Sequence, residues 1–348
     1  MTNEDDLPTI TLVVAAYNEA DTIKGKIDNS LRLEYPAGKL EFIFITDGCT
    51  DDTPAIIAQY PRLRLLHEPL RKGKAAAVNR AMEHVQTELV VFSDANTFIS
   101  KDALIEIAPH FVNAVVGAVA GEKRVTGKGG AVEGESIYWK MESKLKAWES
   151  DFYSVMGAAG ELFALRTQLF QPVPQDSLVD DMEISLRVIE AGYVVSYERN
   201  AYAIENPSLN TREERKRKLR LAAGALQVFT THLRLLMPKR PLITFQYLSH
   251  RVLRWMIAPL LLPLAFTCNC LLLFRGDANW LTAIAFLCQA GWYLPAMIGW
   301  ILDRSERKMR LFFVPYYFCL MNYCMIAGMI RYLKGQQTVY WEKAERGF

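Results

Sequence analysis

The chain has 348 residues, a formal net charge of +2 and a hydrophobic fraction of 51%. This length is enough for one large domain or two ordinary ones, and the balanced charge gives no indication of nucleic acid or another polyanion as a partner. The hydrophobic residues are unevenly distributed, because residues 1–250 have the composition of a soluble α/β protein and residues 251–335 do not. We therefore expect a globular domain followed by a region of a different kind.

Residues 9–96 alternate between short apolar runs and helical stretches. The apolar runs predict strands at 9–15, 40–45, 63–67 and 89–92, and the segments between them predict helices at 20–33, 53–60 and 75–84. Strands that alternate with helices in this way predict an α/β fold, with a mostly parallel sheet, right-handed crossovers and flanking helices. A further strand is expected at 115–125.

A longer helix is expected over residues 133–152. Its apolar residues recur at intervals of three and four, the spacing of one helix face, at Ile137, Met141, Leu145, Trp148 and Phe152. Such a stripe packs into a core by default, and a membrane-facing surface is the alternative.

Two amphipathic stretches, 211–236 and 242–254, precede the apolar region, and Pro238 and Pro241 separate them. The first is strongly basic between residues 215 and 220. A basic amphipathic helix is either a solvated surface or a helix that lies in the membrane interface, and both interpretations stay open.

Three apolar windows follow, at 255–274, 278–302 and 311–333. Each is long enough to cross a hydrocarbon core of about 30 Å as a helix. The chain starts with an acidic, polar segment and no signal peptide, and the loop 303–310 is basic, so we expect the N-terminal domain in the cytosol. The prediction is a multi-pass protein of the cytoplasmic membrane. The side of the tail, 334–348, stays open.

Polar residues follow the strands of the predicted sheet. If the sheet is parallel, segments 16–19, 46–52, 72–74 and 93–96 meet at one edge, where ligands of open α/β sheets bind. There the Tyr17 ring can pack on a base, Asp47 can accept a hydrogen bond from a base, and Lys74 can neutralise a phosphate. These segments predict a nucleoside-diphosphate site.

Asp94 and Asn96 directly follow the apolar run 89–92 and are two residues apart. Two hard oxygen ligands suit a divalent cation that bridges to a diphosphate. The alternative is a turn, in which Asp and Asn are common for local hydrogen-bonding reasons.

A second acidic pair, Asp180-Asp181, precedes a helical pattern in which Ile184 and Val188 face inward. One interpretation is a helix N-cap, where Asp is common. The other is a general base, since a carboxylate can take the proton of a sugar hydroxyl that lies within hydrogen-bond distance.

These motifs, taken in order, resemble those of the membrane-bound family 2 glycosyltransferases, which have a GT-A fold. The resemblance covers roughly residues 9–225, and the membrane portion resembles, less specifically, the polysaccharide-synthase branch. It rests on Val14-Ala15-Ala16-Tyr17-Asn18-Glu19, Thr46-Asp47-Gly48-Cys49-Thr50-Asp51, Gly73-Lys74-Ala75-Ala76-Ala77, Ser93-Asp94-Ala95-Asn96, Gly157 to Arg166 and Asp180-Asp181.

The resemblance implies roles for individual residues. It implies that the nucleotide and donor sugar are bound by Ala16, Tyr17, Asn18, Glu19, Asp47, Lys74, Ser93 and Asp94. It implies an acceptor side formed by Gly157, Gly160, Asp180, Arg217 and Arg220. Asp181 would be the catalytic base, and Asp94 and Asn96 would hold Mg²⁺ or Mn²⁺, which stabilises the leaving diphosphate.

The implied reaction is an inverting sugar transfer from a nucleotide-sugar donor, a UDP-sugar, to a polysaccharide or a lipid-linked oligosaccharide at the bilayer. The chain then divides into a GT-A domain (1–210), interface helices (211–254), a transmembrane region (255–333) and the tail.

Three positions depart from the family pattern. Thr46 stands where an acid often precedes Asp47, Asn96 replaces the second acid of Asp-x-Asp, and Leu221 replaces the Trp that processive synthases carry after Arg220. Two rival functions follow. One is transfer to a polyprenyl phosphate, with Arg217, Lys218 and Arg220 at its phosphate. The other is a catalytically degenerate scaffold subunit of the membrane.

Overall fold

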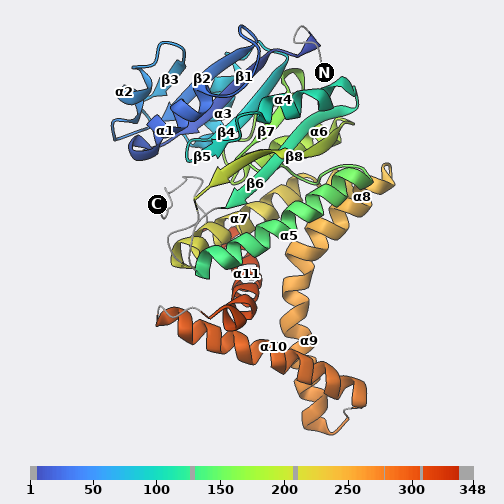
Figure 1. Cartoon of the computed structure of the whole chain (residues 1–348). Helices are drawn as coiled ribbons and strands as arrows, with labels where there is room; N and C mark the ends of the chain where they lie inside the picture. The colour runs from blue at the N-terminus through green and yellow to red at the C-terminus, as the bar shows by residue number, and fades with distance from the viewer. Residues whose placement is uncertain (1–5, 126–129, 207–210, 278, 306–308, 337–348) are drawn as a thin grey trace.

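The computed structural model describes residues 6–125, 130–206, 211–277, 279–305 and 309–336. An α/β domain lies at one end of the molecule, a layer containing α5, α7 and α8 lies against it, and α9 to α11 extend away from this layer (Figure 1). Most of the predicted tail, residues 337–348, lies outside the described residues.

One sheet of eight strands organises the α/β domain, in the order β3-β2-β1-β4-β7-β6-β8-β5. The strands are Ile10–Ala16 (β1), Leu40–Asp47 (β2), Arg64–Glu68 (β3), Leu89–Asp94 (β4), Thr97–Ile99 (β5), Val116–Val125 (β6), Phe163–Arg166 (β7) and Val194–Glu205 (β8). The first four strands pair in parallel, as do β6 and β8, whereas β7 runs antiparallel to both of its neighbours and β5 is antiparallel to β8. The sheet is therefore mixed, with the predicted parallel arrangement in its N-terminal half.

Helices cover both faces of this sheet. The short ones are Ala20–Leu31 (α1), Thr53–Ile57 (α2), Lys74–Met82 (α3), Ala103–Ile107 (α4) and Asp180–Glu190 (α6). Alternate residues of β1 point to opposite faces, so Leu12 and Val14 join one buried cluster and Val13 joins the other. The sheet therefore has a hydrophobic core on each side.

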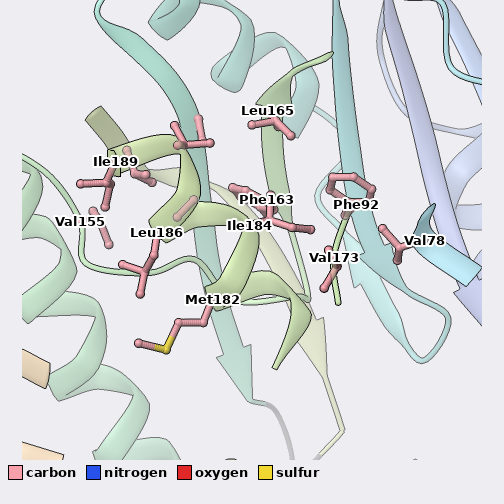
Figure 2. Close-up of a cluster of buried hydrophobic side chains, with 14 of the residues drawn as sticks. Val78, Phe92, Val155, Phe163, Leu165, Val173, Met182, Ile184, Leu186 and Ile189 are labelled. Carbon is pink, nitrogen blue, oxygen red and sulfur yellow. The ribbon is translucent and has the colours of Figure 1, made fainter. Parts of the chain in front are cut away.

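The core beside α3 and α6 fixes the position of α6. Phe92 of β4 stacks on Phe163 of β7, with ring centroids 6.0 Å apart, and Ile184 and Leu186 of α6 lie in the same cluster (Figure 2). Burying one such side chain stabilises the fold by roughly 1.5–3 kcal/mol. Because Asp180 and Asp181 form the first turn of α6, this packing also positions the acidic pair.

The long helix α5, Gly130–Phe152, buries its charged face and exposes its apolar one. Glu142 is 3% exposed and Lys146 is 4% exposed, whereas Trp148 is 65% exposed and Phe152 is 54% exposed. The default prediction of a core position is therefore wrong for Met141, Trp148 and Phe152, which lie on the surface as in the alternative interpretation. Leu145 is half-buried, and the side chain of Ile137 lies outside the described residues. The exposed stripe continues onto α8, where Phe245 packs on Phe152 at 6.1 Å between ring centroids.

The basic helix α7, Thr211–Thr231, follows the α/β domain in the chain and lies against the last apolar helix. It packs on α11, Arg310–Leu333, through small residues: a Cβ at Gly328 would lie 2.5 Å from Ala222 Cβ. Pro241–Gln246 (α8) continues into a π-helix, Tyr247–Ile257, and then into Ala258–Arg275 (α9). π-Helical segments are rare in proteins, and those that occur are mostly single turns at functional sites. The segment Tyr247–Ile257 is longer than a single turn, which makes it a candidate functional element.

Three helical segments are long and apolar enough to cross a membrane: Pro241–Arg275, Trp280–Arg304 and Leu311–Leu333. The first begins earlier than expected because α8, the π-helix and α9 are continuous. The second forms α10, Trp280–Arg304. Little of the first two is buried inside the molecule, which is what a lipid-exposed helix requires.

Candidate active site

The carboxyl ends of β1, β2 and β4 lie side by side. Ala16 pairs with Thr46, and Ala15 pairs with Asp94, so the residues that follow these strands emerge at one edge of the sheet. This register brings the segments after the three strands together, as expected for the edge where α/β proteins bind ligands.

A lysine and two carboxylates meet at this edge. Lys74 Nζ donates a hydrogen bond to Asp94 Oδ1 at 2.8 Å and lies 3.5 Å from Asp180 Oδ2. Burial alone lowers the pKa of Lys74, but the charges of Asp180, Asp94 and Asp181 outweigh it and raise that pKa above its usual range. Lys74 is therefore a fixed positive charge at the centre of an acidic cluster.

Gly160 lies among these groups because β7 runs antiparallel to β4. The start of β7 meets the end of β4, with Phe163 paired to Phe92, so the segment just before β7 lies beside Asp94. A Cβ at Gly160 would lie 3.3 Å from Lys74 Nζ, 3.4 Å from Asp181 Oδ2 and 3.7 Å from Asp94 Oδ2. The missing side chain leaves the space between the lysine and the acids open.

Asp181 combines partial burial with a neighbouring acid. Its Oδ1 accepts a hydrogen bond from Met182 N at 2.8 Å. Burial and the charge of Asp180 raise the pKa of Asp181 to about 7, although Lys74 opposes the shift. The N-cap interpretation is incorrect, since Val179 occupies that position and Asp180 and Asp181 lie in the first turn of α6.

The residues after β1 and β2 are tied to the neighbouring loops. Asp47 Oδ2 accepts hydrogen bonds from Lys72 N at 3.0 Å and Gly73 N at 2.6 Å, which holds the turn before α3. Asn18, in a left-handed conformation with φ 53°, binds Thr50 N at 2.8 Å through its Oδ1. Both side chains therefore shape the edge of the sheet.

A cation lies over the aromatic ring at this edge, and it was not among the residues predicted from the sequence. The guanidinium carbon of Arg71 lies 3.8 Å from the centre of the Tyr17 ring. Lys72, by contrast, points away and pairs with Glu68 at 2.9 Å. The signal for Arg71 was its place in the basic run that ends at Lys74.

A buried lysine behind Asp94 was also missed. Lys26 of α1 is fully buried, and its Nζ donates to Ser93 Oγ at 2.6 Å and to Thr97 O at 2.9 Å. Burial lowers the pKa of Lys26 to about 7, although the charge of Asp94 opposes this shift. Ser93 is thus an internal contact, and Lys26 holds the turn that presents Asp94 and Asn96.

The donor set fits a hard divalent cation. Asp94 and Asn96 both line the cavity described below and offer carboxylate and amide oxygens. Within the described residues, no group of three or more His, Cys, Asp and Glu side chains is arranged to hold a metal alone. Two protein oxygens suit Mg²⁺ or Mn²⁺, ions that complete their coordination with water and phosphate oxygens.

The acidic cluster forms the wall of a cavity of about 1080 Å³. The nominated residues that line it are Glu19, Lys74, Asp94, Asn96, Gly157, Gly160, Asp180, Asp181, Arg217 and Arg220. Those that do not are Ala16, Tyr17, Asn18, Asp47 and Ser93. Arg220 has no hydrogen-bond or ion-pair partner among the described residues, and Asp180, Asp181 and Asp94 attract its charge.

The opposite wall comes from α5 and the π-helix, which sequence reasoning did not nominate. Arg254 Nη1 lies 2.8 Å from Glu142 Oε2, and His250 Nδ1 binds Glu149. Arg251 donates hydrogen bonds to the carbonyl oxygens of Met156 and Gly157, so the π-helix holds the segment before Gly160. These contacts join segments about a hundred residues apart, and no local sequence motif predicts them.

Residues 11–173 match the family described as glycosyl transferase family 2. Together with the mixed GT-A-type sheet and the acid cluster at its edge, this match identifies a family 2 glycosyltransferase domain. The sequence expectation of this family is confirmed.

Particular relatives agree with this assignment. The chain is 28% identical over 202 residues to a β-monoglucosyldiacylglycerol synthase of Nostoc sp., covering 53% of this chain and 42% of the relative. It is 27% identical over 201 residues to a poly-β-1,6-N-acetyl-D-glucosamine synthase of Staphylococcus epidermidis, covering 55% and 48%. The chain thus matches less than half the length of each of these curated relatives.

The fold is also that of a solved glycosyltransferase. A mannosyltransferase from Pyrobaculum calidifontis, determined in complex with GDP-Man and Mn²⁺, superposes with a TM-score of 0.74 at 23% identity. The superposition covers 96% of this chain and 90% of that one, so the shared fold includes the apolar helices.

Proposed function

We propose that the chain is an inverting glycosyltransferase that moves a sugar from a nucleotide-sugar to an acceptor at the membrane. The observation that carries this proposal is the convergence of Lys74, Asp94 and Asp181 around Gly160, at the edge of a family 2 domain. This intact set also argues against the scaffold alternative, in which nothing would maintain three charged groups around an open space.

In the proposed reaction, Asp181 takes the proton of an acceptor hydroxyl as that oxygen attacks the anomeric carbon of the donor. The bond from the anomeric carbon to the diphosphate oxygen breaks, its electron pair leaves with the nucleoside diphosphate, and the configuration inverts. A base with a pKa near the working pH suits this proton transfer, and the raised pKa of Asp181, about 7, meets that condition.

The leaving group gathers negative charge, and Lys74 and Arg220 supply the matching positive charge beside it. Asp94 and Asn96 would hold Mg²⁺ or Mn²⁺, which stabilises the charge of a leaving diphosphate when bound. The nucleoside would lie at the rim, along Tyr17, Asn18 and Asp47. We assign a UDP-sugar as the donor; the GDP-Man in the Pyrobaculum structure makes GDP-mannose the competitor to test.

The acceptor side of the proposal follows from the cavity, which continues from Asp181 to apolar side chains of the membrane helices. This continuity favours a lipid-linked acceptor, such as a lipid-linked oligosaccharide, over a long free polysaccharide. A polyprenyl phosphate is the second candidate, favoured by the basic side chains of Arg217 and Lys218, which also line the cavity. The catalytic domain would then face the cytosol, anchored by a multi-pass region in the cytoplasmic membrane.

Replacement of Asp181 tests this proposal. We expect Asp181→Asn to lower kcat by about 10²–10⁴-fold with little change in donor binding, since it removes the base and keeps the shape. For the native protein, kcat/KM should rise with pH and level off above about 8, because Asp181 accepts a proton only when ionised. The assay is release of nucleoside diphosphate from UDP-glucose, UDP-N-acetylglucosamine, UDP-galactose and GDP-mannose.

The matched control is Asp176→Asn, on the exposed loop before α6, which should leave turnover unchanged. An Asp181→Asn protein with native turnover would remove the base assignment. Full activity after chelation of divalent cations would remove the metal.

A further inference from the structure

Lys146 of α5 is a buried charge without a partner. The residue is 4% exposed, and its Nζ has no hydrogen-bond or ion-pair partner in the part of the chain that the structure describes. It lines the same cavity as Asp181 and Arg251. An ammonium group has three donors, and leaving them unused in a buried position is costly, so the site is suited to an anion that arrives from outside.

The neighbours of Lys146 do not meet this need. Glu142 and Glu149 lie on the same face of α5, but Arg254 and His250 already bind them. Burial and the charge of Arg251 lower the pKa of Lys146, while the charges of Glu142, Glu161 and Asp181 oppose this lowering. Acids near Lys146 thus favour its charged form without any of them forming a hydrogen bond to it.

The position of Lys146 separates it from the donor diphosphate. Its electrostatic neighbours are Glu142, Glu161, Arg251 and Asp181, whereas those of Arg220 are Asp180, Asp181 and Asp94. Asp181 is common to both sets. Arg220 therefore lies near the metal ligand Asp94, and Lys146 lies near Arg251 of the π-helix.

The same cavity is also lined by apolar side chains of the last three helices. Its wall includes Leu262 of α9, Trp292 of α10, and Phe318 and Met321 of α11. These helices are long and apolar enough to cross a membrane. A molecule that extends from Asp181 along this wall would have a polar head, an anionic group near Lys146 and an apolar tail.

We propose that Lys146, with Arg251 beside it, binds the phosphate of a lipid acceptor whose apolar chain lies against α9, α10 and α11. The proposal rests on the proposed function, since it places the accepting head group at Asp181. The shared chemistry is a phosphate joined to a long apolar chain, which either an isoprenoid phosphate or a glycerophospholipid supplies.

Binding in the absence of a nucleotide-sugar tests this site directly. The full chain is kept in dodecyl maltoside, a detergent without phosphate, and titrated with farnesyl phosphate or farnesol while tryptophan fluorescence is recorded; Trp139, Trp255 and Trp292 line the cavity. We expect the native protein to bind farnesyl phosphate at least about tenfold more tightly than farnesol, and Lys146→Met to abolish that preference. Lys146→Arg should keep it.

The control is Lys144→Met, on the exposed face of the same helix, which should bind like the native protein. The proposal is overturned if Lys146→Met keeps the native preference for farnesyl phosphate, or if inorganic phosphate at the same concentrations changes the tryptophan fluorescence as much as farnesyl phosphate does. Tighter binding of dihexanoyl phosphatidylglycerol than of farnesyl phosphate would assign the site to a glycerophospholipid, and the reverse to an isoprenoid.

A kinetic experiment separates this site from the donor site. Lys146→Met should raise the KM of a phosphate-bearing lipid acceptor about tenfold and leave the donor KM unchanged. A raised donor KM with an unchanged acceptor KM would assign Lys146 to the donor and overturn the proposal. Because the binding titration contains no donor, absence of sugar transfer would contradict the proposed function without affecting that result.

Discussion

At the ends of β1 and β2, polar side chains bind backbone groups of the next loop, whereas across the cavity the charged side chains of α5 and the π-helix bind each other. Asp47 reaches Gly73 N, 26 residues along the chain, but His250 reaches Glu149, 101 residues away. We call the first region the strand-end side and the second the helical side. The strand-end side is built from short motifs, and the helical side exists only once distant helices have packed.

The comparison also separates two uses of burial. On the strand-end side, strand residues are apolar and the charges begin where the strands end, so the pattern follows the hydrophobic rule. On the helical side, α5 buries Glu142 and Lys146 and exposes Trp148. A helix with its apolar face outward is stable where that face meets lipid, so the inverted pattern is consistent with an interface position for α5.

Gly160 lies where the two sides meet, and its substitution has the largest expected effect of the three changes that test this comparison. In Gly160→Ala the new methyl group would lie 3.3 Å from Lys74 Nζ and 3.4 Å from Asp181 Oδ2, so the two groups must move apart. Misplacement by an ångström costs about a hundredfold in rate, and these side chains must move by less than that, so we expect kcat to fall by up to about a hundredfold. Gly291→Ala, where a Cβ meets nothing within 4 Å, is the control. Native turnover in Gly160→Ala would contradict the assignment of catalysis to the close arrangement of Lys74 and Asp181 around Gly160.

Lys26 tests whether the strand-end side depends on support from α1. Lys26→Met leaves Ser93 Oγ and Thr97 O without the donor that holds the turn beside Asp94. Loss of such supporting contacts weakens metal binding by about 10–100-fold, so we expect a corresponding rise in the Mn²⁺ concentration at half-maximal activity. Lys24→Met, on the exposed face of α1, should not change it. An unchanged Mn²⁺ requirement in Lys26→Met would show that Asp94 and Asn96 keep their positions without support from α1.

His232 follows α7 and tests, through stability and with the smallest expected effect, a second long-range contact between helices, this one with α6. Its Nε2 lies 3.1 Å from Glu183 Oε2 and its Nδ1 lies 3.1 Å from Glu190 Oε1. Burial lowers the pKa of His232, but the hydrogen bonds and charges of Glu183 and Glu190 outweigh it and raise that pKa to about 9.

Because the folded pKa exceeds the usual 6.5, the charged pair stabilises the protein fully below pH 6.5, and this stabilisation disappears as the pH rises through 9. We expect the Tm of the native protein to fall by a few degrees more than that of His232→Gln between pH 6.5 and 9. Arg187 and Tyr247 also lie near Glu183, so Arg187→Gln serves as the control for general loss of charge. Parallel pH profiles of native protein and His232→Gln would contradict the assignment.

Several parts of the molecule could be predicted from the sequence because they depend on neighbours in the chain. The strands β1 to β4 are continuous apolar runs, and the polar residues after them had to meet at one edge once the sheet was parallel. The acidic pair at Asp180 was found for the same reason, since it begins a helix with an inward apolar face. By contrast, the place of Gly160 depends on β7, an antiparallel strand inserted between β4 and β6.

The sequence alone determined the α/β class, the family 2 domain, the acids at positions 94 and 181 and the three apolar segments, because each is encoded in a contiguous pattern of hydrophobic and polar residues. Only the tertiary structure decided which face of α5 is buried, that Lys26 supports Asp94, and that Lys146 lines a cavity that the last three apolar helices also line. These features depend on contacts between segments far apart in the chain. A helical period identifies two faces of a helix, but the surroundings decide which of them is the inner one.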